Sequence, residues 1–253
     1  MKTNISAVVL THNSVKFVGK ALKSLKWCDE IVVIDDVSDD GIERVAKKYK
    51  AKFYRRKMDG DFATQRNFAY TKVKNDWILF VDADEAVTKG LKNEIEQKFS
   101  QGVGEISAFG MRRNDYFLDH LLKYGPAGQA YFWRLVNKKS CRWVGKIFEI
   151  PQVDGWQICL ESRLDHYRHE GAAELVIKAN YYSDLEAKML FKNKVKPRPK
   201  QIIWDPIVRF CHYYFWQKAF LDGIPGLIFV VLGSVLVKQL TEIKLWIKWA
   251  EKK

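Results

Sequence analysis

Asp82 and Asp84 are the residues whose type and spacing point most directly to chemistry. They stand one residue apart at the end of a short apolar run that begins at Ile78 and is followed by Glu85. Aspartates at positions i and i+2 of an extended strand point to the same side, where two hard oxygen ligands can hold Mg²⁺ or Mn²⁺ against a diphosphate. The competing interpretation is an acidic turn, with Asp84 or Glu85 near the start of a helix that runs through Leu91.

A strand must deliver these carboxylates, and the first hundred residues alternate strands with helices. Strands separated by helices of this length imply βαβ units and a parallel sheet with right-handed crossovers. The ligand crevice of such a sheet lies outside the carboxyl ends of its strands, which places both aspartates at the site. The expected strands are residues 5–11, 31–34, 52–54 and a run from Trp77, and the expected helices are 14–27, 42–49 and 62–73, the first capped by Ser14.

A second acidic loop follows the strand expected at 31–34. Asp35 stands at the tip of this strand, where its carboxylate can accept hydrogen bonds from a nucleobase or ribose. The alternative role is helix capping and turn formation, which explains Ser38, Asp39 and Asp40 better than it explains Asp35. No GxGxxG follows the first strand and no GxxxxGK[ST] is present, so an ordinary dinucleotide fold and a P-loop are both disfavoured.

Composition bounds the class of protein. The 253 residues suffice for one large α/β domain with an appendage, or for two small domains. Lys and Arg outnumber Asp and Glu by 43 to 30, a net charge of +13. An anionic partner is therefore expected: a nucleotide, a phosphorylated acceptor, nucleic acid or an acidic membrane surface. The excess is larger after residue 100, with 24 basic against 15 acidic residues, so the later part is the expected docking surface.

The cysteines and the N-terminus point to a cytosolic protein. The 4 cysteines are widely spaced and form no CxxC pair, which argues against a zinc site or a disulfide framework. The first residues lack the apolar stretch and small-residue cleavage site of a signal peptide. We therefore expect reduced structural thiols and a catalytic part that stays where it is made.

Four motifs occur in one order at compatible spacings: Thr11-His12-Asn13, the acidic loop 33–41, Gln65-Arg66-Asn67, and the strand with its aspartates at 77–85. Together they resemble glycosyltransferase family 2, and specifically the small enzymes similar to lipopolysaccharide-core β-glucosyltransferases. Each motif alone is weak, whereas the ordered set is specific. The resemblance is strong over the first part of the chain, through Leu91, and thinner from there to Tyr182.

The resemblance implies a GT-A fold, an α/β architecture with a Rossmann-like, mostly parallel central sheet. It also implies a nucleotide-diphosphate sugar donor, Mg²⁺ or Mn²⁺ as cofactor, and inversion at the anomeric carbon. Within the donor site, Asp35 would contact the nucleoside, and Asp82, Ala83 and Asp84 would form the donor and metal motif. Asp82 would face the ribose or the metal, whereas Asp84 would be the direct metal ligand.

Two further residues match donor-site positions of the family. Arg66 would lie near the donor diphosphate, where a guanidinium can stabilise the charge of the leaving group. An exposed helix salt bridge is the alternative for Arg66. Thr11 would contribute mainly backbone contacts to the donor, and its other role is to end a strand.

Glu149 is the expected general base, because an inverting transfer needs a group that takes the proton of the acceptor hydroxyl. Related enzymes often carry His-Glu where this chain has Phe148-Glu149, so it departs from the family at the first of these positions. Apolar neighbours would raise the pKa of Glu149 into a range that suits a base, and a strand-edge Glu facing solvent is the alternative. His166 matches the late histidine that returns to the metal in several GT-A enzymes, unless it is a hydrogen-bonded structural residue.

The chain changes character after a helix expected at 172–192. Residues 192–200 alternate Lys or Arg with other residues across two prolines, which predicts an extended basic linker. An aromatic segment typical of a membrane interface follows from Asp205. The apolar run 224–237 is shorter than the roughly 20 residues that a spanning helix needs, which favours an interfacial or re-entrant segment. A basic amphipathic helix over 236–248 completes a region expected to lie on anionic lipid. The alternative is a helical hairpin packed on the catalytic domain or used for oligomerisation.

The sequence therefore predicts a catalytic domain at residues 1–190 and a membrane-associating helical region at 191–253. The predicted activity is inverting, metal-dependent transfer from a nucleotide sugar, with UDP-glucose as the first donor by resemblance, to a lipid-linked or lipopolysaccharide-type acceptor. The expected location is the cytoplasmic side of the inner membrane, as a peripheral or monotopic protein. The alternatives are a polyprenyl-phosphate glycosyltransferase, which needs no base, and a non-catalytic membrane-binding protein. Nucleic acid is not an expected partner, because the sequence holds no RRM, KH or zinc-finger motif.

Overall fold

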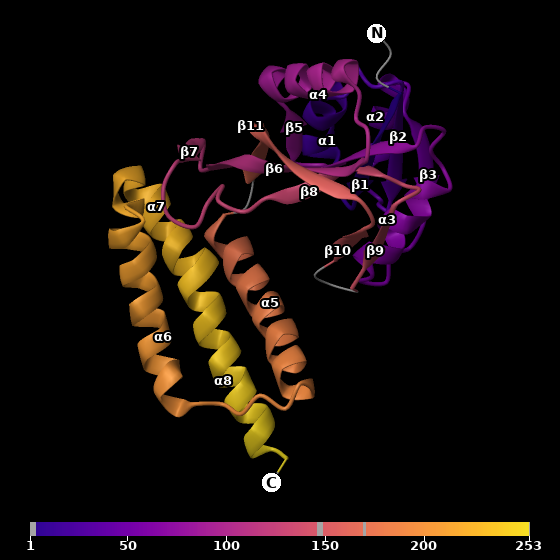
Figure 1. Ribbon diagram of the computed structural model, residues 1–253. Helices are drawn as coiled ribbons and strands as arrows, with labels where there is room; N and C mark the ends of the chain where they lie inside the picture. Colours follow the sequence, from indigo (N-terminus) through magenta and orange to yellow (C-terminus); the bar gives the residue numbers. More distant parts are fainter. Residues whose placement is uncertain (1–3, 146–148, 169–170, 253) are drawn as a thin grey trace. The chain divides into compact units, whose positions relative to one another are not determined.

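The computed structural model describes residues 4–145, 149–168 and 171–252, which fall into two compact units. The first unit comprises residues 1–113 and 130–166, and the second comprises 114–129 and 167–253 (Figure 1). The boundary predicted between residues 190 and 191 lies inside the second unit, because the helix before it packs with the C-terminal helices. Phe148, where the sequence departs from the family pattern, lies outside the described residues.

Parallel strands form one half of the sheet in the first unit. They are β1 (Ile5–Thr11), β2 (Glu30–Asp35), β3 (Lys52–Arg55) and β4 (Trp77–Asp82), in the order β3-β2-β1-β4. The connecting helices are α1 (Val15–Ser24), α2 (Ile42–Lys48) and α3 (Phe62–Tyr70). These elements confirm the predicted βαβ units. Their register sets Thr11 opposite Asp35 and Leu10 opposite Asp82, so the polar strand ends share one edge.

Antiparallel strands form the other half, so the sheet as a whole is mixed. The order continues from β4 through β8 (Phe132–Asn137), β6 (Ile106–Phe117), β11 (Trp156–Arg168) and β5 (Glu85–Val87). In addition, β7 (His120–Leu122) pairs with β6, and β9 (Cys141–Val144) forms a separate pair with β10 (Ile150–Val153).

The segment after the two aspartates is a strand and not the start of a helix. Glu85 opens β5, and α4 (Lys89–Gln101) begins only after Thr88, whose hydroxyl accepts a hydrogen bond from the Leu91 amide at 3.1 Å. The interpretation of Asp84 or Glu85 as a helix-capping residue is therefore wrong. Ser14 likewise does not cap α1 with its side chain. The Val15 amide donates instead to Asp40 at 2.7 Å.

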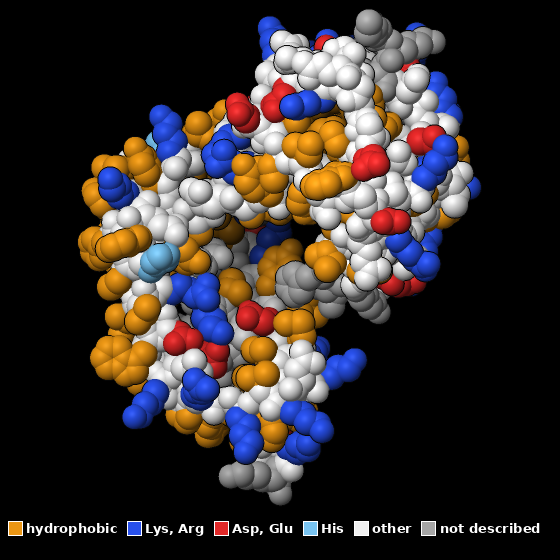
Figure 2. All heavy atoms as spheres, in the orientation of Figure 1, with side chains coloured by type: hydrophobic (Ala, Val, Ile, Leu, Met, Phe, Trp, Pro, Cys, Tyr) orange, Lys and Arg blue, Asp and Glu red, His pale blue; other side chains and the backbone are white. Residues whose placement is uncertain are grey.

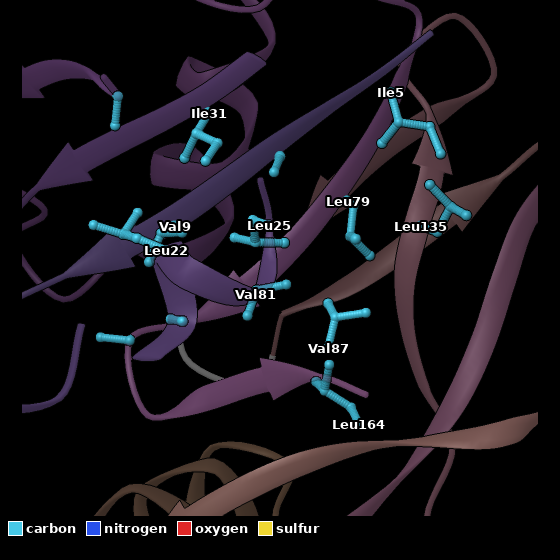
Figure 3. Close-up of a cluster of buried hydrophobic side chains, with 14 of the residues drawn as sticks. Ile5, Val9, Leu22, Leu25, Ile31, Leu79, Val81, Val87, Leu135 and Leu164 are labelled. Atoms are coloured by element: carbon cyan, nitrogen blue, oxygen red, sulfur yellow. The ribbon is translucent and has the colours of Figure 1, made fainter. Parts of the chain in front are cut away.

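The core lies on both faces of the parallel strands, which explains their almost unbroken apolar runs. On one face, side chains of β1 and β4 such as Val9 and Leu79 pack against Leu22 and Leu25 around α1, and all four are fully buried (Figure 3). On the other face, a second cluster gathers side chains from the same strands with residues of α3 and β9. Burial on both faces fixes the strand ends that carry the polar residues.

The second unit is mainly helical. Its helices are α5 (Ala172–Lys192), α6 (Pro199–Cys211), α7 (Gly223–Val230) and α8 (Leu236–Ala250), with wide turns at His212–Trp216 and Val231–Val235 and a short turn at Ala219–Asp222. The bounds predicted for α5 are confirmed. The basic linker predicted over 192–200 is shorter, because Lys192 ends α5 and α6 begins at Pro199, which leaves residues 193–198 non-helical. Pro206 lies inside α6. Helix α8 packs along α5 and also contacts α6 (Figure 1).

Helix α8 packs against protein through one side only. Thr241, Glu242 and Leu245 of this helix are buried within the unit. The apolar positions of the pattern, Leu236, Leu240, Ile243 and Ile247, lie on the opposite side of the helix and stay partly or largely exposed. The role of that side at a lipid surface therefore stays a prediction. The described chain contains one helical stretch, Ala219–Ala250, that is long and apolar enough to cross a membrane by length and composition.

Candidate active site

Asp82 is held by two arginines at the carboxyl edge of the parallel strands. Because β8 runs antiparallel beside β4, Arg134 reaches back to the Asp82 carboxylate and donates to both of its oxygens. Nη2 of Arg66 also lies 3.5 Å from Oδ1 of Asp82. Burial raises the pKa of Asp82, but the charges of Arg134 and Arg66 outweigh burial and hold that pKa well below its usual range. Asp82 is therefore ionised, and its carboxylate is paired with the guanidinium groups of Arg134 and Arg66.

Glu85 belongs to the same cluster of charged side chains as Asp82 and Arg134. Its side chain is fully buried and accepts a hydrogen bond from Nη2 of Arg134 at 2.7 Å. Nη1 of Arg113 lies 3.5 Å from the same carboxylate, and the Asp82 amide donates to its other oxygen at 2.9 Å. Burial lowers the pKa of Arg134, but the charges of Asp82 and Glu85 raise it further than burial lowers it. Sequence reasoning missed Arg113 and Arg134, and the signal that could have found them is the presence of Arg inside otherwise apolar strands.

Asp84 faces His166. The pairing of β5 with β11 brings this histidine close to the two aspartates. The register places His166 opposite Glu85, one residue from Asp84. Nε2 of His166 lies 3.4 Å from Oδ2 of Asp84, and the histidine side chain is buried whereas the aspartate is one-third exposed. Burial raises the pKa of Asp84, but the hydrogen bond and charge of His166 lower it, with a net shift below the usual value. A carboxylate and an imidazole thus converge at the end of the strand.

These two side chains suit a divalent cation that is bound mainly by its substrate. No group of three or more His, Cys, Asp or Glu side chains is gathered for a metal within the described ranges. Mg²⁺ is usually bound through one or two carboxylates plus substrate phosphates and water, and Mn²⁺ also accepts imidazole. Asp84 and His166 could hold such an ion together with a diphosphate. Asp82 is less suited to be a ligand, because arginines occupy its oxygens.

Asp35 and Thr11 meet at the neighbouring strand ends, as the sheet order predicts. The Thr11 hydroxyl donates to Oδ1 of Asp35 at 3.0 Å, and the Ser38 amide donates to Oδ2 at 2.9 Å. The Ser38 hydroxyl donates to Oδ1 as well. Asp35 is fully buried and therefore stabilises its own loop, a role that the sequence assigned to the later acids instead.

Arg66 is buried, so its interpretation as an exposed helix salt bridge is wrong. Nε and Nη2 of Arg66 lie 3.1 Å and 3.0 Å from Oε1 of Glu149. The guanidinium also lies over the rings of Trp143 and Phe80, 4.7 Å and 5.1 Å from their centroids. Glu149 is only 17% exposed, so the alternative of a glutamate pointing into solvent is wrong as well. Arg66 links Glu149 to Asp82 within the first unit.

Comparison with known proteins assigns this arrangement to a family. Residues 6–144, more than half of the chain, match the model of Glycosyl transferase family 2. The chain belongs to this family. As a family 2 glycosyltransferase it combines the parallel β3-β2-β1-β4 half with the antiparallel half of the GT-A fold. The match includes Asp35, Arg66, Asp82 and Asp84, whereas Glu149 and His166 lie beyond its end.

Relatives of this glycosyltransferase extend over nearly its whole length. A protein of Rickettsia bellii (strain RML369-C) named as an uncharacterized glycosyltransferase is 31% identical, over 95% of this chain and 87% of its own. The lipopolysaccharide core biosynthesis glycosyltransferase LpsC of Rhizobium meliloti (strain 1021) is 26% identical, over 92% and 89%. Among solved structures, residues 1–349 of S. aureus TarS superimpose with a TM-score of 0.47 and 13% identity, over 98% of this chain and 92% of that one.

A recess of about 690 Å³ lies beside the cluster in the glycosyltransferase, lined by α3 and the pair β9 and β10. None of the carboxylates Asp82, Asp84 and Glu149 lines it. Asn67 of its lining fixes β9, because its side-chain amide donates to the Trp143 carbonyl at 2.8 Å and its oxygen accepts from the Trp143 amide at 3.0 Å. This double hydrogen bond holds the strand that precedes Glu149 against the helix that carries Arg66.

Proposed function

We propose that this family 2 glycosyltransferase transfers a sugar, with inversion, from a nucleotide-diphosphate sugar to a lipid-linked or lipopolysaccharide-type glycan. The observation that carries the proposal is the pairing of Asp84 with His166 beside an Asp82 that arginines hold. The arrangement lies at the strand ends, where open α/β sheets bind their ligands. The relative named for lipopolysaccharide core biosynthesis supports the acceptor class, and UDP-glucose is the first donor to test.

In this proposal the donor lies along the carboxyl edge of β1, β2 and β4. Thr11 and the loop that Asp35 holds would contact the nucleoside, because the Asp35 side chain itself is fully buried, and Asp84 with His166 would hold Mg²⁺ or Mn²⁺. A divalent cation bound there would offset the negative charge that develops on the departing diphosphate. Arg134 and Arg66 fix the Asp82 carboxylate, and Asp82 with Ala83 shapes the donor side of the motif. Arg66 would also add positive charge near the diphosphate.

Glu149 is the proposed general base for the acceptor hydroxyl. Its carboxylate oxygen Oε1 is held by Arg66, so the base has a defined position relative to Asp82. Its second oxygen, Oε2, would accept the acceptor proton while the hydroxyl oxygen attacks the anomeric carbon from the side opposite the leaving diphosphate. Arg66 in this role is a positioning residue, because it acts on the reaction through Glu149 and Asp82.

The proposed location is the cytoplasmic face of the inner membrane. A lipid-linked acceptor is presented at a membrane surface, and the second unit carries large exposed apolar side chains such as Trp204, Trp216 and Ile224. Aromatic side chains near cationic ones are typical of membrane interfaces. The protein would associate with the membrane as a peripheral or monotopic enzyme.

Hydrolysis of a panel of nucleotide sugars by the purified protein tests this function. The wild type should release UDP from one of these nucleotide sugars in the presence of Mn²⁺, and the release should be lost in EDTA. Asp84→Asn should show no such release. Glu149→Gln should keep donor binding and lose transfer to an acceptor extract by about 10²-fold or more, the usual contribution of a general base. Absence of nucleotide-sugar turnover together with absence of nucleotide binding would overturn the proposal.

A further inference from the structure

Helix α6 presents large apolar side chains to solvent along one side. Ile203 and Trp204 are 65% and 61% exposed, and Ile207 and Val208, one turn later, are 48% and 62% exposed. Residues three and four apart lie on the same face of a helix, so these four side chains form one stripe. Pro206, between the two pairs, is buried. The outer side of α6 is therefore the side that lacks a protein partner within the described chain.

The exposed apolar surface continues in the segment that follows α6. Phe215, Trp216, Phe220, Leu221 and Ile224 are 44% to 81% exposed, with Trp216 the most exposed of them. This segment contacts α6 and α7 within the same unit. Together with the α6 stripe it is called the α6 face here. Soluble monomers rarely expose contiguous apolar surface of this extent unless it binds something.

Cationic side chains lie at the N-terminal end of the α6 face. Lys194, Lys196 and Arg198 lie in the connection that leads into α6, and Lys200 is in its first turn. Figure 2 shows Lys and Arg side chains gathered at the end of the second unit that holds this connection, with hydrophobic side chains along its α6 side. An apolar stripe with lysine and arginine at one end matches a surface that is apolar inside and anionic at its boundary.

Helix α8 lies behind α6 and is bonded to α5 through polar residues of one side. Nζ of Lys244 donates to the Asn180 side chain and to the Ser183 hydroxyl, each at 2.9 Å. The Thr241 hydroxyl donates to the Glu186 carboxylate at 3.0 Å. These bonds fix α8 against α5, and α8 in turn contacts α6.

We propose that the second unit docks on an anionic lipid bilayer through the α6 face, with α8 as its internal support. The proposal names the membrane partner of the enzyme and rests on the proposed function only for its lipid-linked acceptor. A second copy of this chain fits the face less well, because lysine is depleted at protein interfaces whereas cations at the rim favour anionic headgroups. Apolar side chains would enter the boundary between headgroups and acyl chains, and the basic connection would lie among the headgroups.

Flotation with vesicles tests the proposal without any enzymatic readout. Wild-type protein should float with phosphatidylcholine vesicles that contain phosphatidylglycerol, and less with phosphatidylcholine alone. The double variant Ile203→Asp and Trp204→Asp should lose at least about tenfold in vesicle partition, because burying one such side chain corresponds to about that factor. Ile177→Asp on α5, where Ile177 is 67% exposed, is the matched control and should float as the wild type does.

A second variant tests the charge contribution. Lys194→Gln with Lys196→Gln and Arg198→Gln should weaken binding to anionic vesicles several-fold, and should leave binding to neutral vesicles unchanged. Equal loss in the α6 variant and in Ile177→Asp, or no loss in either, would overturn the proposal. A dimer in sedimentation that the α6 variant dissociates, with no vesicle binding by the wild type, would also overturn it. UDP release in detergent-free buffer should be unchanged in all these variants, which separates this test from that of the donor site.

Discussion

Arg134 ties together the two carboxylates that define the motif. It donates to Asp82 and to Glu85 from the neighbouring strand, and Arg66 adds a contact from α3. The aspartates could be predicted because a strand that ends in Asp82 and Asp84 has a local signature. Arg134 could not, because its partners lie about fifty residues away in sequence and only the antiparallel pairing of β4 with β8 brings them together.

Replacing Glu85 by alanine is predicted to destabilise the first unit. The change leaves Arg134 buried with one carboxylate instead of two, and breaking a buried ion pair typically costs about 3–5 kcal/mol of unfolding free energy. Urea unfolding monitored by circular dichroism measures the loss. Glu96→Ala is the control, because Glu96 forms an exposed i,i+4 pair with Lys92 and should cost less than about 0.5 kcal/mol. Equal effects of the two changes would contradict the assigned role of Glu85.

His166→Ala is predicted to weaken Mn²⁺-dependent UDP binding by about tenfold or more. The change removes the imidazole that lies 3.4 Å from Asp84, and with it one of two proposed metal ligands. Calorimetric titration of UDP in the presence of Mn²⁺ measures the affinity. His212→Ala, in the second unit, should bind UDP as the wild type does. Unchanged affinity in His166→Ala would mean that this histidine is structural.

At the scale of elements, apolar runs and helical periodicity predicted the parallel strands and α5. The three-residue strands β5 and β7 escaped prediction because such short segments carry no measurable periodicity. Helix α8 shows a different limit of the sequence. Its pattern identifies an apolar side, but the side that packs on α5 carries Thr241 and Lys244 instead. Only the packing of the second unit distinguishes the two.

Glu94 is predicted to stabilise the contact of α4 with β11 in a pH-dependent way. Its carboxylate accepts hydrogen bonds from the amides of Glu161 and Ser162 at 2.9 Å and 2.8 Å. Burial raises the pKa of Glu94, but these hydrogen bonds lower it more, so the folded pKa lies below the unfolded value. A depressed carboxyl pKa stabilises the fold above the unfolded pKa of about 4.3 and loses that contribution as pH falls through the folded pKa.

Glu94→Gln should therefore cost about 1 kcal/mol of unfolding free energy at neutral pH, a value that allows for partial solvent exposure. Denaturant unfolding of wild type and variant at pH 7 and at pH 3 measures the difference at each pH. The difference should shrink at pH 3, where the wild-type carboxyl is increasingly protonated. A difference that grows toward acid would contradict the sign of the shift.

At the scale of the whole molecule, the proposed donor residues lie in one compact unit and the proposed membrane face lies in the other. Gly226→Ala should affect the second unit alone. A Cβ on Gly226 would lie 2.4 Å from the Ala219 carbonyl oxygen and 2.8 Å from Cβ of Asp222. The Asp222 carboxylate accepts hydrogen bonds from the amides of Lys123 and Tyr124, so its displacement would disturb them as well. Overpacking of this kind typically costs about 1–3 kcal/mol.

Limited proteolysis combined with UDP titration checks this prediction. Cleavage within residues 167–253 should become faster in Gly226→Ala, while UDP affinity stays that of the wild type. Gly233→Ala is the control, because its added Cβ would meet only Phe229 ring atoms at 3.5 Å or more, which is ordinary contact. Loss of UDP binding in Gly226→Ala would show that the donor site depends on the second unit.

Calorimetric titration of UDP into the full-length protein, with and without Mn²⁺, tests the proposed donor site most directly. The wild type should bind UDP with Mn²⁺ and lose that binding in EDTA. Asp84→Asn should abolish the Mn²⁺-dependent part, and Asp59→Asn, a change at an exposed aspartate paired with Lys57, should have no effect. UDP binding that needs no metal, or that survives unchanged in Asp84→Asn, would contradict a metal-held donor at Asp84 and His166.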